Sequence, residues 1–227
     1  MKLILIFLFF INFFYAQATF EKAEKLYQQQ HFEEAKIAFK DCVSQNPKNY
    51  KAIEYLGDCY GQLKDWDNAI AQYKILKDKF SLNANYWYKY GGALGMKAKE
   101  SNKFKALALI DDVEEAFLKA AKLDAKHIDT RWALVMLYLE LPSIIGGSEK
   151  KAQKYATELL QISKVDGYLA KGYIDEYFKR YHNAEKNYIM AHEIGNSKTT
   201  FQKLYNLYLN KLNNKEKAQK LKDNFKN

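Results

Sequence analysis

The chain has little proline, glycine, cysteine or histidine: 2, 10, 2 and 4 residues out of 227. The shortage of proline and glycine, which interrupt helices, favours a helical domain. No His-Glu-x-x-His motif occurs, which excludes that signature of metalloproteases. Charged residues make up 28% of the chain, but 48% is apolar, so the composition argues against an intrinsically disordered protein.

Positive charge is the main electrostatic bias of the chain, with 36 Lys and Arg residues against 27 Asp and Glu residues. The net charge is +9 and the isoelectric point is about 9.2. Because the lysines are spread along the chain rather than clustered, they favour a solvated basic surface. Weak affinity for anionic polymers or for a membrane surface is the alternative interpretation.

Residues 1–18 have the pattern of a secretory signal peptide: a basic start, an apolar run and a small-residue exit. The run Leu3–Ala16 is short for a membrane span, which needs about 20 residues. Cleavage after Ala16 or after Ala18 fits the pattern, and an uncleaved N-terminal anchor is the alternative. The segment is similar to signal peptides of Gram-negative bacteria. It predicts an exported protein, either periplasmic or secreted.

The stretch Tyr50–Phe80 has the apolar periodicity of two amphipathic helices. In each half, apolar or small residues recur at three- and four-residue steps, the spacing of one helical face. The residues with this spacing are Ile53, Leu56, Gly57 and Tyr60, then Ala69, Tyr73 and Leu76. The pattern pauses at Lys64–Asp67, which predicts a turn there with Asp67 as the cap of the second helix.

This stretch resembles a tetratricopeptide repeat, a helix–turn–helix unit of about 34 residues. The pair Leu56-Gly57 matches the first-helix pattern of the family. In the second helix, Ala69 and Tyr73 match its small and aromatic positions. The stretch departs from the family pattern where Ile53 replaces the frequent tryptophan and Ser81 replaces the frequent proline.

The same spacing recurs elsewhere in the chain. Ala35 precedes Ala69 by one full repeat length, and Phe39 precedes Tyr73 by the same interval. Further matches are Gly91, one repeat length after Gly57, and the pair Gly172 and Ala184, which are spaced like Gly57 and Ala69. The equal intervals are stronger evidence of repetition than helical periodicity alone.

The register breaks once, after Gly91. The next aromatic–small pair, Phe117 and Ala120, comes about ten residues late. The extra length lies in Met96–Leu109 and predicts either two longer helices or a protruding loop. The glycines after position 90 follow no predicted strand and lack phosphate-loop spacing, so they predict close helix packing instead.

The segment Leu141–Ser148 predicts an extended turn in the fourth repeat. Pro142 stops one helix and Ser148 is placed to cap the next. Two interpretations remain open. The segment is a ligand-contacting loop, or it is a structural turn in which Ile144 and Ile145 pack into the core.

The resemblance implies an all-α fold, a right-handed α-solenoid of helix–turn–helix repeats. The predicted parts are a signal peptide at 1–18 and a solenoid at 19–227. The predicted repeats are 20–49, 50–82, 83–128, 129–165, 166–198 and a polar capping repeat at 199–227, since the end of a repeat array needs a soluble face.

No catalytic, cofactor-binding or metal-binding residues are predicted. The acidic residues Asp111-Asp112 and Glu114-Glu115 are expected to open a helix, where its dipole favours negative charge, with a metal site as the minor alternative. No Gly-x-Ser-x-Gly motif surrounds the serines of the Leu141–Ser148 turn.

Cys42 and Cys59 are expected to be two separate, buried thiols. If their helices run antiparallel about a turn near position 48, the two cysteines are offset by roughly 7 Å along the axis. A disulfide needs Cα atoms within about 7 Å in total, before the helix separation is added. A disulfide is the alternative, because an exported chain with an even number of cysteines invites one.

The remaining predicted functional surface is the concave groove, which the first helices of tetratricopeptide repeats line. Four candidate contacts for a protein or peptide partner follow from the register: Tyr88, Trp132, Met136 and Tyr173. Leu169 shares this position, and Glu54, Asp58 and Glu176 are expected to add an acidic rim suited to a basic segment. The alternative is that these aromatic residues pack between repeats.

These features predict a non-enzymatic scaffold of the cell envelope that binds a peptide or protein segment in its groove, without cofactors and without specific nucleic-acid binding. A second interpretation is an envelope assembly or secretion factor that associates with anionic membrane or cell-wall polymer. A third is a hydrolase or accessory enzyme that uses the Met96–Leu109 insertion.

Overall fold

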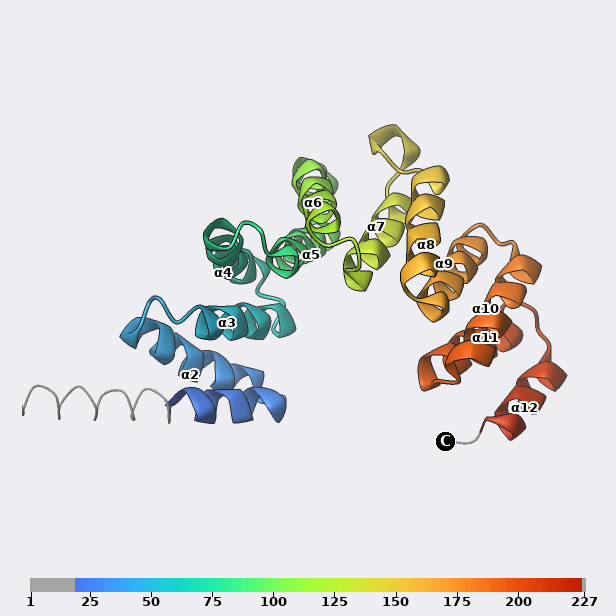
Figure 1. Ribbon diagram of the computed structural model, residues 1–227, viewed down its shortest axis with the longest axis horizontal. Helices are drawn as coiled ribbons and strands as arrows, with labels where there is room; N and C mark the ends of the chain where they lie inside the picture. Colours follow the sequence, from blue (N-terminus) through green and yellow to red (C-terminus); the bar gives the residue numbers. More distant parts are fainter. Residues whose placement is uncertain (1–18, 226–227) are drawn as a thin grey trace, which may run out of the picture. The chain divides into compact units, whose positions relative to one another are not determined.

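The computed structural model describes residues 19–225; the predicted signal peptide lies outside the described residues. Within 19–225 all regular secondary structure is helical, as predicted, and no strand occurs. After a first helix over 19–28, the helices, labelled in Figure 1, are α2 (Phe32–Gln45), α3 (Tyr50–Gln62), α4 (Trp66–Lys79), α5 (Ala84–Glu100), α6 (Lys103–Leu123), α7 (Ile128–Glu140), α8 (Glu149–Ile162), α9 (Lys164–Tyr177), α10 (Tyr181–Gly195), α11 (Lys198–Asn210) and α12 (Lys215–Asn224), with a 3-10 turn η1 (Ser143–Ile145) before α8. This arrangement confirms the all-α helical-repeat solenoid.

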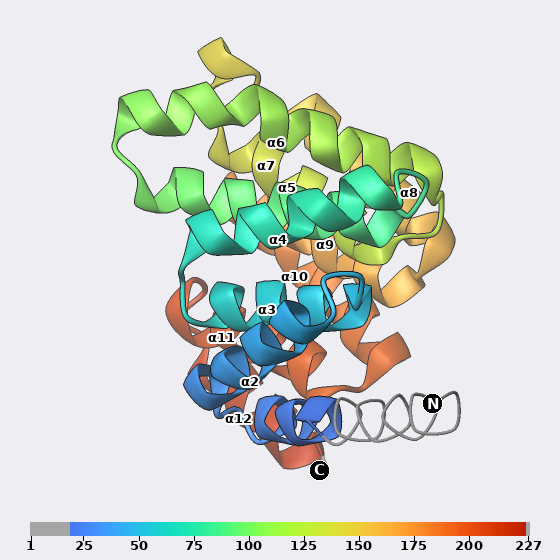
Figure 2. The same cartoon turned by 90° about the vertical axis from the view of Figure 1, so that its left-hand side faces the viewer.

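The helices are grouped into two compact units, one ending at Leu123 and the other beginning at Asp124. In each unit every helix packs against the next one along the chain, so the first helix of a pair contacts both its own partner and the preceding pair (Figure 2). In the second unit α7 also contacts α9, which places the first helices of two successive pairs beside each other.

The core of the first unit uses the predicted contact between a small residue and an aromatic ring. Ala35, Phe39 and Ala69 are fully buried. A Cβ atom added to Gly57 would lie 2.8 Å from Cε1 of Tyr73, closer than real side chains approach. The glycine therefore allows α3 and α4 to pack with the Tyr73 ring between them. Gly91 has the same role, because its added Cβ would lie 2.9 Å from Cβ of Ala116 in α6.

The second unit repeats this packing with a tighter contact. A Cβ atom added to Gly172 would lie 2.4 Å from Cε1 of Tyr188, which is fully buried. The Tyr188 hydroxyl donates a hydrogen bond of 2.8 Å to Glu176. Ala184, on the same helix as Tyr188, is also fully buried. The ring is thus held by packing on its sides and by a hydrogen bond at its end.

Short polar side chains cap most of the helices. Ser148 accepts from the backbone N–H of Lys151, as predicted. The prediction for α4 was wrong by two residues: Asp65 is the cap and accepts from Asn68 N–H, whereas Asp67 lies in the first turn of the helix. The apolar pattern could not resolve this, because two aspartates flank Trp66 and either could accept the bond.

The insertion at 96–109 lengthens both helices of the third pair. The helix α5 has 17 residues and α6 has 21, and the two are joined at residues 101–102. Asp111 and Glu115 consequently lie in the middle of α6, and the prediction that their cluster opens a helix is wrong. The lengthened α6 already starts at Lys103, because the inserted sequence is itself a good helix former.

The turn between α7 and α8 contains η1, and Gly146 takes a left-handed conformation after it, with φ of 104°. Ile144 is 92% exposed and Ile145 is half-buried. The expectation that Ile144 packs into the core is therefore wrong.

Cys42 and Cys59 are both free and buried, as expected from their offset along the helices. Within residues 19–225, no helix is long and apolar enough to cross a membrane.

Candidate functional site

The four predicted groove residues are divided between the two units. Tyr88 lies on α5 in the first unit. Trp132 and Met136 lie on α7 and Tyr173 on α9, so three of the four belong to neighbouring helices of the second unit. We call Trp132, Met136 and Tyr173 the α7–α9 face.

Trp132 is held in one orientation by the start of α9. Its indole Nε1 donates a hydrogen bond of 2.9 Å to Oδ1 of Asp166. Asp166 also accepts a bond of 2.6 Å from the hydroxyl of Ser163, the N-terminal cap of α9. The ring is half-buried. The polar edge of the indole is therefore satisfied inside the protein, and part of its apolar surface remains accessible.

Met136 and Tyr173 provide the other part of the face. Met136 is 40% exposed and Tyr173 is half-buried. Burial, together with the negative charges of Glu140 and Glu176, raises the pKa of Tyr173. Glu140 lies one turn beyond Met136 on α7, and α7 contacts α9, the helix that carries Tyr173. From α11, Lys203 Nζ lies 5.2 Å from the centre of that ring.

Tyr88 packs within its own helix pair. Its ring centre lies 6.1 Å from that of Phe117 on α6, and the side chain is half-buried.

The expected acidic rim is largely neutralised by contacts within the protein. Lys89 lies 2.7 Å from a carboxylate oxygen of Glu54 and 2.7 Å from one of Asp58. Asp58 also accepts a bond of 2.6 Å from the Tyr73 hydroxyl, and Glu54 accepts one of 3.1 Å from Tyr86. These carboxylates are already engaged, which leaves little negative charge for a basic ligand.

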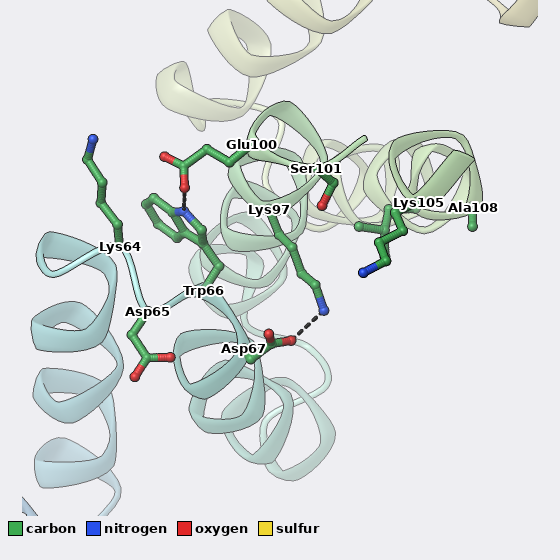
Figure 3. A pocket seen from close by; sticks show the side chains of 10 residues that line it. Lys64, Asp65, Trp66, Asp67, Lys97, Glu100, Ser101, Lys105 and Ala108 are labelled. Carbon is green, nitrogen blue, oxygen red and sulfur yellow. Dashed lines mark hydrogen bonds and ion pairs between the residues drawn. The ribbon is translucent and has the colours of Figure 1, made fainter. Parts of the chain in front are cut away.

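A second candidate site is a cleft of about 550 Å³ in the first unit. The α3–α4 turn, the end of α5 and the start of α6 form its walls. Two contacts, shown in Figure 3, fix its sides: Trp66 Nε1 donates a bond of 2.7 Å to Glu100, and Lys97 pairs with Asp67. No group of three or more His, Cys, Asp or Glu in the described part of the chain is placed to hold a metal ion.

Two tryptophan–carboxylate contacts were not predicted, although the sequence contains a signal for them. Trp66 donates to Glu100 and Trp132 donates to Asp166, and the partners of each bond are separated by one repeat length. An indole and a carboxylate at this interval therefore identify contacts between successive helix pairs.

The structure is similar to solved tetratricopeptide-repeat proteins, although no protein-family profile and no curated protein matches the sequence. A tetratricopeptide-repeat protein of Thermus thermophilus, TTC0263, has a TM-score of 0.69 and 14% identity, over 86% of this chain and 99% of that one. PilW, a widely conserved type IV pilus biogenesis factor, has a TM-score of 0.66 and 14% identity, over 92% and 90% of the two chains. YrrB, a tetratricopeptide-repeat protein with an unusual peptide-binding site, has a TM-score of 0.53 and 14% identity, over 80% and 87%.

These likenesses establish the fold: the chain has the helical-repeat architecture of tetratricopeptide-repeat proteins. At such low identity they carry no information about a particular activity or partner.

Proposed function

We propose that the protein is a non-enzymatic interaction scaffold that binds a peptide or protein segment on the α7–α9 face. The observation that carries this proposal is the exposure of Met136 on α7, which also carries the half-buried Trp132 and contacts α9, the helix of the half-buried Tyr173. Aromatic side chains and methionine are the residues that most often anchor protein interfaces. The fold is compatible with this role, because YrrB, with which the chain shares the fold alone, has a peptide-binding site.

The geometry of Trp132 favours binding. Its hydrogen bond to Asp166 fixes the ring before a partner arrives. A fixed side chain loses little conformational entropy on binding, so more of the contact energy contributes to affinity. Glu176, the acidic-rim residue that lies on α9, already accepts the Tyr188 hydrogen bond, so the partner segment is expected to be recognised mainly through apolar side chains.

The partner chemistry follows from what surrounds the face. The negative charge of Glu140, at the end of α7, acts on Tyr173, and Lys203 of α11 lies 5.2 Å from the centre of its ring. Charges of both signs at its edge suit a segment with an apolar centre and polar ends. This arrangement is typical of interfaces, which have an apolar core and a polar rim.

Selection from a displayed random peptide library tests this function. Peptides selected on the unmodified protein should contain aromatic or branched aliphatic residues, and should bind Trp132→Ala and Tyr173→Ala at least about tenfold more weakly. Ile144→Ala, which changes an exposed apolar residue in another part of the second unit, is the matched control and should bind normally. Peptides that bind both aromatic variants as tightly as the unmodified protein would contradict the proposal.

We also propose that the protein is exported, on the basis of the signal-peptide pattern of residues 1–18. Expression of the full chain in a Gram-negative host, followed by fractionation and mass measurement, tests this. A periplasmic or secreted product that begins at Gln17 or at Thr19 would support export. A cytoplasmic product that retains Met1–Ala18 would contradict it.

A further inference from the structure

The connection between α5 and α6 presents an apolar ring to solvent. Phe104 is 88% exposed, the most exposed aromatic side chain of residues 19–225. Leu107, one turn further along the same face of α6, is 51% exposed. Figure 2 shows that this end of the α5–α6 pair extends beyond the corresponding ends of α3 and α4. We call residues 101–107 the α5–α6 tip.

The tip is also basic. Residues 101–107 contain two lysines and no acidic residue, and the carboxylate of the preceding Glu100 accepts the Trp66 hydrogen bond. Lys103 and Lys105 lie on either side of Phe104, and both are exposed. An exposed apolar ring between two lysines combines the two contributions that bind proteins to anionic membrane surfaces, burial of an apolar side chain and attraction of lysine to lipid phosphate.

The geometry of the tip fits a membrane better than a protein partner. Phe104 does not line the adjacent cleft and stands at the end of a hairpin. A stable protein interface buries about 800 Å² on each partner, whereas a phenylalanine side chain supplies only about 150–250 Å². A bilayer needs no complementary pocket, because lipid headgroups rearrange around an inserted side chain.

The negative charges of α6 lie away from the tip. Asp111 is the first acidic residue of this helix and follows Phe104 by seven positions, about 10 Å along the helix axis. This distance exceeds the Debye length of about 8 Å at physiological ionic strength. A surface that touches Phe104 end-on is therefore attracted by the lysines and only weakly repelled by Asp111.

We propose that the α5–α6 tip docks on an anionic phospholipid bilayer. Phe104 enters the interfacial region end-on, and Lys103 and Lys105 contact lipid phosphates. The proposal goes beyond peptide binding, because it uses different residues on a different unit. The second interpretation of the sequence was association with an anionic surface, and the proposal assigns that association to the α5–α6 tip.

Vesicle sedimentation tests the proposal with residues 19–227, which include both compact units but not the apolar N-terminal segment that would itself bind lipid. Vesicles with equal parts of phosphatidylglycerol and phosphatidylcholine should bind the protein, and binding should weaken as salt is added. Vesicles of phosphatidylcholine alone should bind it far more weakly. Equal binding to both kinds of vesicle would overturn the proposal.

Variants assign the binding to the tip. Phe104→Ala should weaken binding to the anionic vesicles about tenfold, and Lys103→Gln or Lys105→Gln about fivefold each. Leu82→Ala, which alters an 81% exposed apolar residue of the same unit, is the matched control and should bind as the unmodified protein does. A Phe104→Ala variant that binds as tightly as the Leu82→Ala control would overturn the proposal.

A spectroscopic readout separates insertion from simple adsorption. In Phe104→Trp the added tryptophan should shift its emission to shorter wavelength with anionic vesicles, whereas Leu82→Trp should show no such shift. The tip variants should retain the affinity of the unmodified protein for the selected peptides, so failure of this proposal is distinguishable from failure of the peptide site. If Phe104→Ala instead loses a protein partner while vesicle binding is unchanged, the tip is a protein-docking site and the membrane proposal is wrong.

Discussion

Replacement of Gly172 by alanine tests the packing register of the second unit. The added Cβ would lie 2.4 Å from Cε1 and 2.5 Å from Cδ1 of Tyr188. The ring cannot easily move away, because it is fully buried and its hydroxyl is bonded to Glu176 at 2.8 Å. Overpacking of this kind costs up to about 3 kcal/mol. Alanine recovers about 1 kcal/mol through its higher helix propensity.

The net effect expected for Gly172→Ala is a loss of about 2 kcal/mol in the free energy of unfolding. For a chain of this size, that loss corresponds to a fall of about 4–8 °C in the melting midpoint. Circular dichroism during thermal and urea unfolding measures both quantities. Gly92 provides the matched control: it also lies inside a helix, but no atom beyond its chain neighbours and the nearby backbone of its own helix lies within 4 Å of its added Cβ. Gly92→Ala should stabilise the protein by up to about 1 kcal/mol, and a stabilising Gly172→Ala would refute the packing account.

Three further predictions follow from burial and charge. Ala184→Leu should reduce the free energy of unfolding by the cost of overpacking, about 1–3 kcal/mol, and so lower the melting midpoint. An unchanged midpoint would show that the repeat register is wrong. The hydrogen bond from Arg180 lowers the pKa of Glu149. A carboxyl group whose pKa is lower in the folded state than in the unfolded state stabilises the folded protein at pH values above the unfolded-state pKa. This stabilisation is lost as the pH falls through the folded-state pKa. Glu149→Gln should therefore lower the free energy of unfolding by about 0.5 kcal/mol at neutral pH. The difference between the two proteins should shrink below about pH 4. A difference in urea titrations that does not depend on pH would contradict this. Burial raises the pKa of Cys59 to about 12 and also raises the pKa of Cys42. Both thiols should therefore resist alkylation in the folded protein and react in denaturant without reductant; rapid labelling of the native protein would argue against their burial.

The repeated spacings were sufficient to predict the fold. Ala35 and Ala69, one repeat length apart, are both fully buried, and Gly57 meets the Tyr73 ring as its position in the repeat predicts. These contacts occur between helices that are neighbours in the sequence. A pattern of small and aromatic residues at fixed intervals therefore carries the information needed to position them.

Polar contacts between repeats were harder to predict. Lys89 reaches Asp58 from the next helix pair, and this contact engages the carboxylate that we expected to be available to a partner. Helical periodicity assigns a residue to a face, but it does not show which long side chain from the next helix pair occupies the same space. The exposure of Ile144 was missed for a related reason, because its surroundings depend on the path of an irregular turn rather than on a helical face.

The α7–α9 face was predicted only in part. The register placed Trp132, Met136 and Tyr173 one step beyond the core face of first helices, and the structure places these helices in contact. The bond from Trp132 to Asp166 was not foreseen. Whether a partner binds there is a property of the exposed surface, which the repeat pattern does not specify.

The most direct test of the proposed function uses Trp132 as its own reporter. The chain has three tryptophans, so Trp66→Phe with Trp87→Phe leaves Trp132 as the only one. Titration with a selected peptide should shift its emission to shorter wavelength in a saturable way, because the partner covers the exposed part of the ring. Adding Tyr173→Ala should weaken the titration about tenfold or more. A peptide that binds tightly while the emission of Trp132 stays unchanged would show that the α7–α9 face is not the binding site.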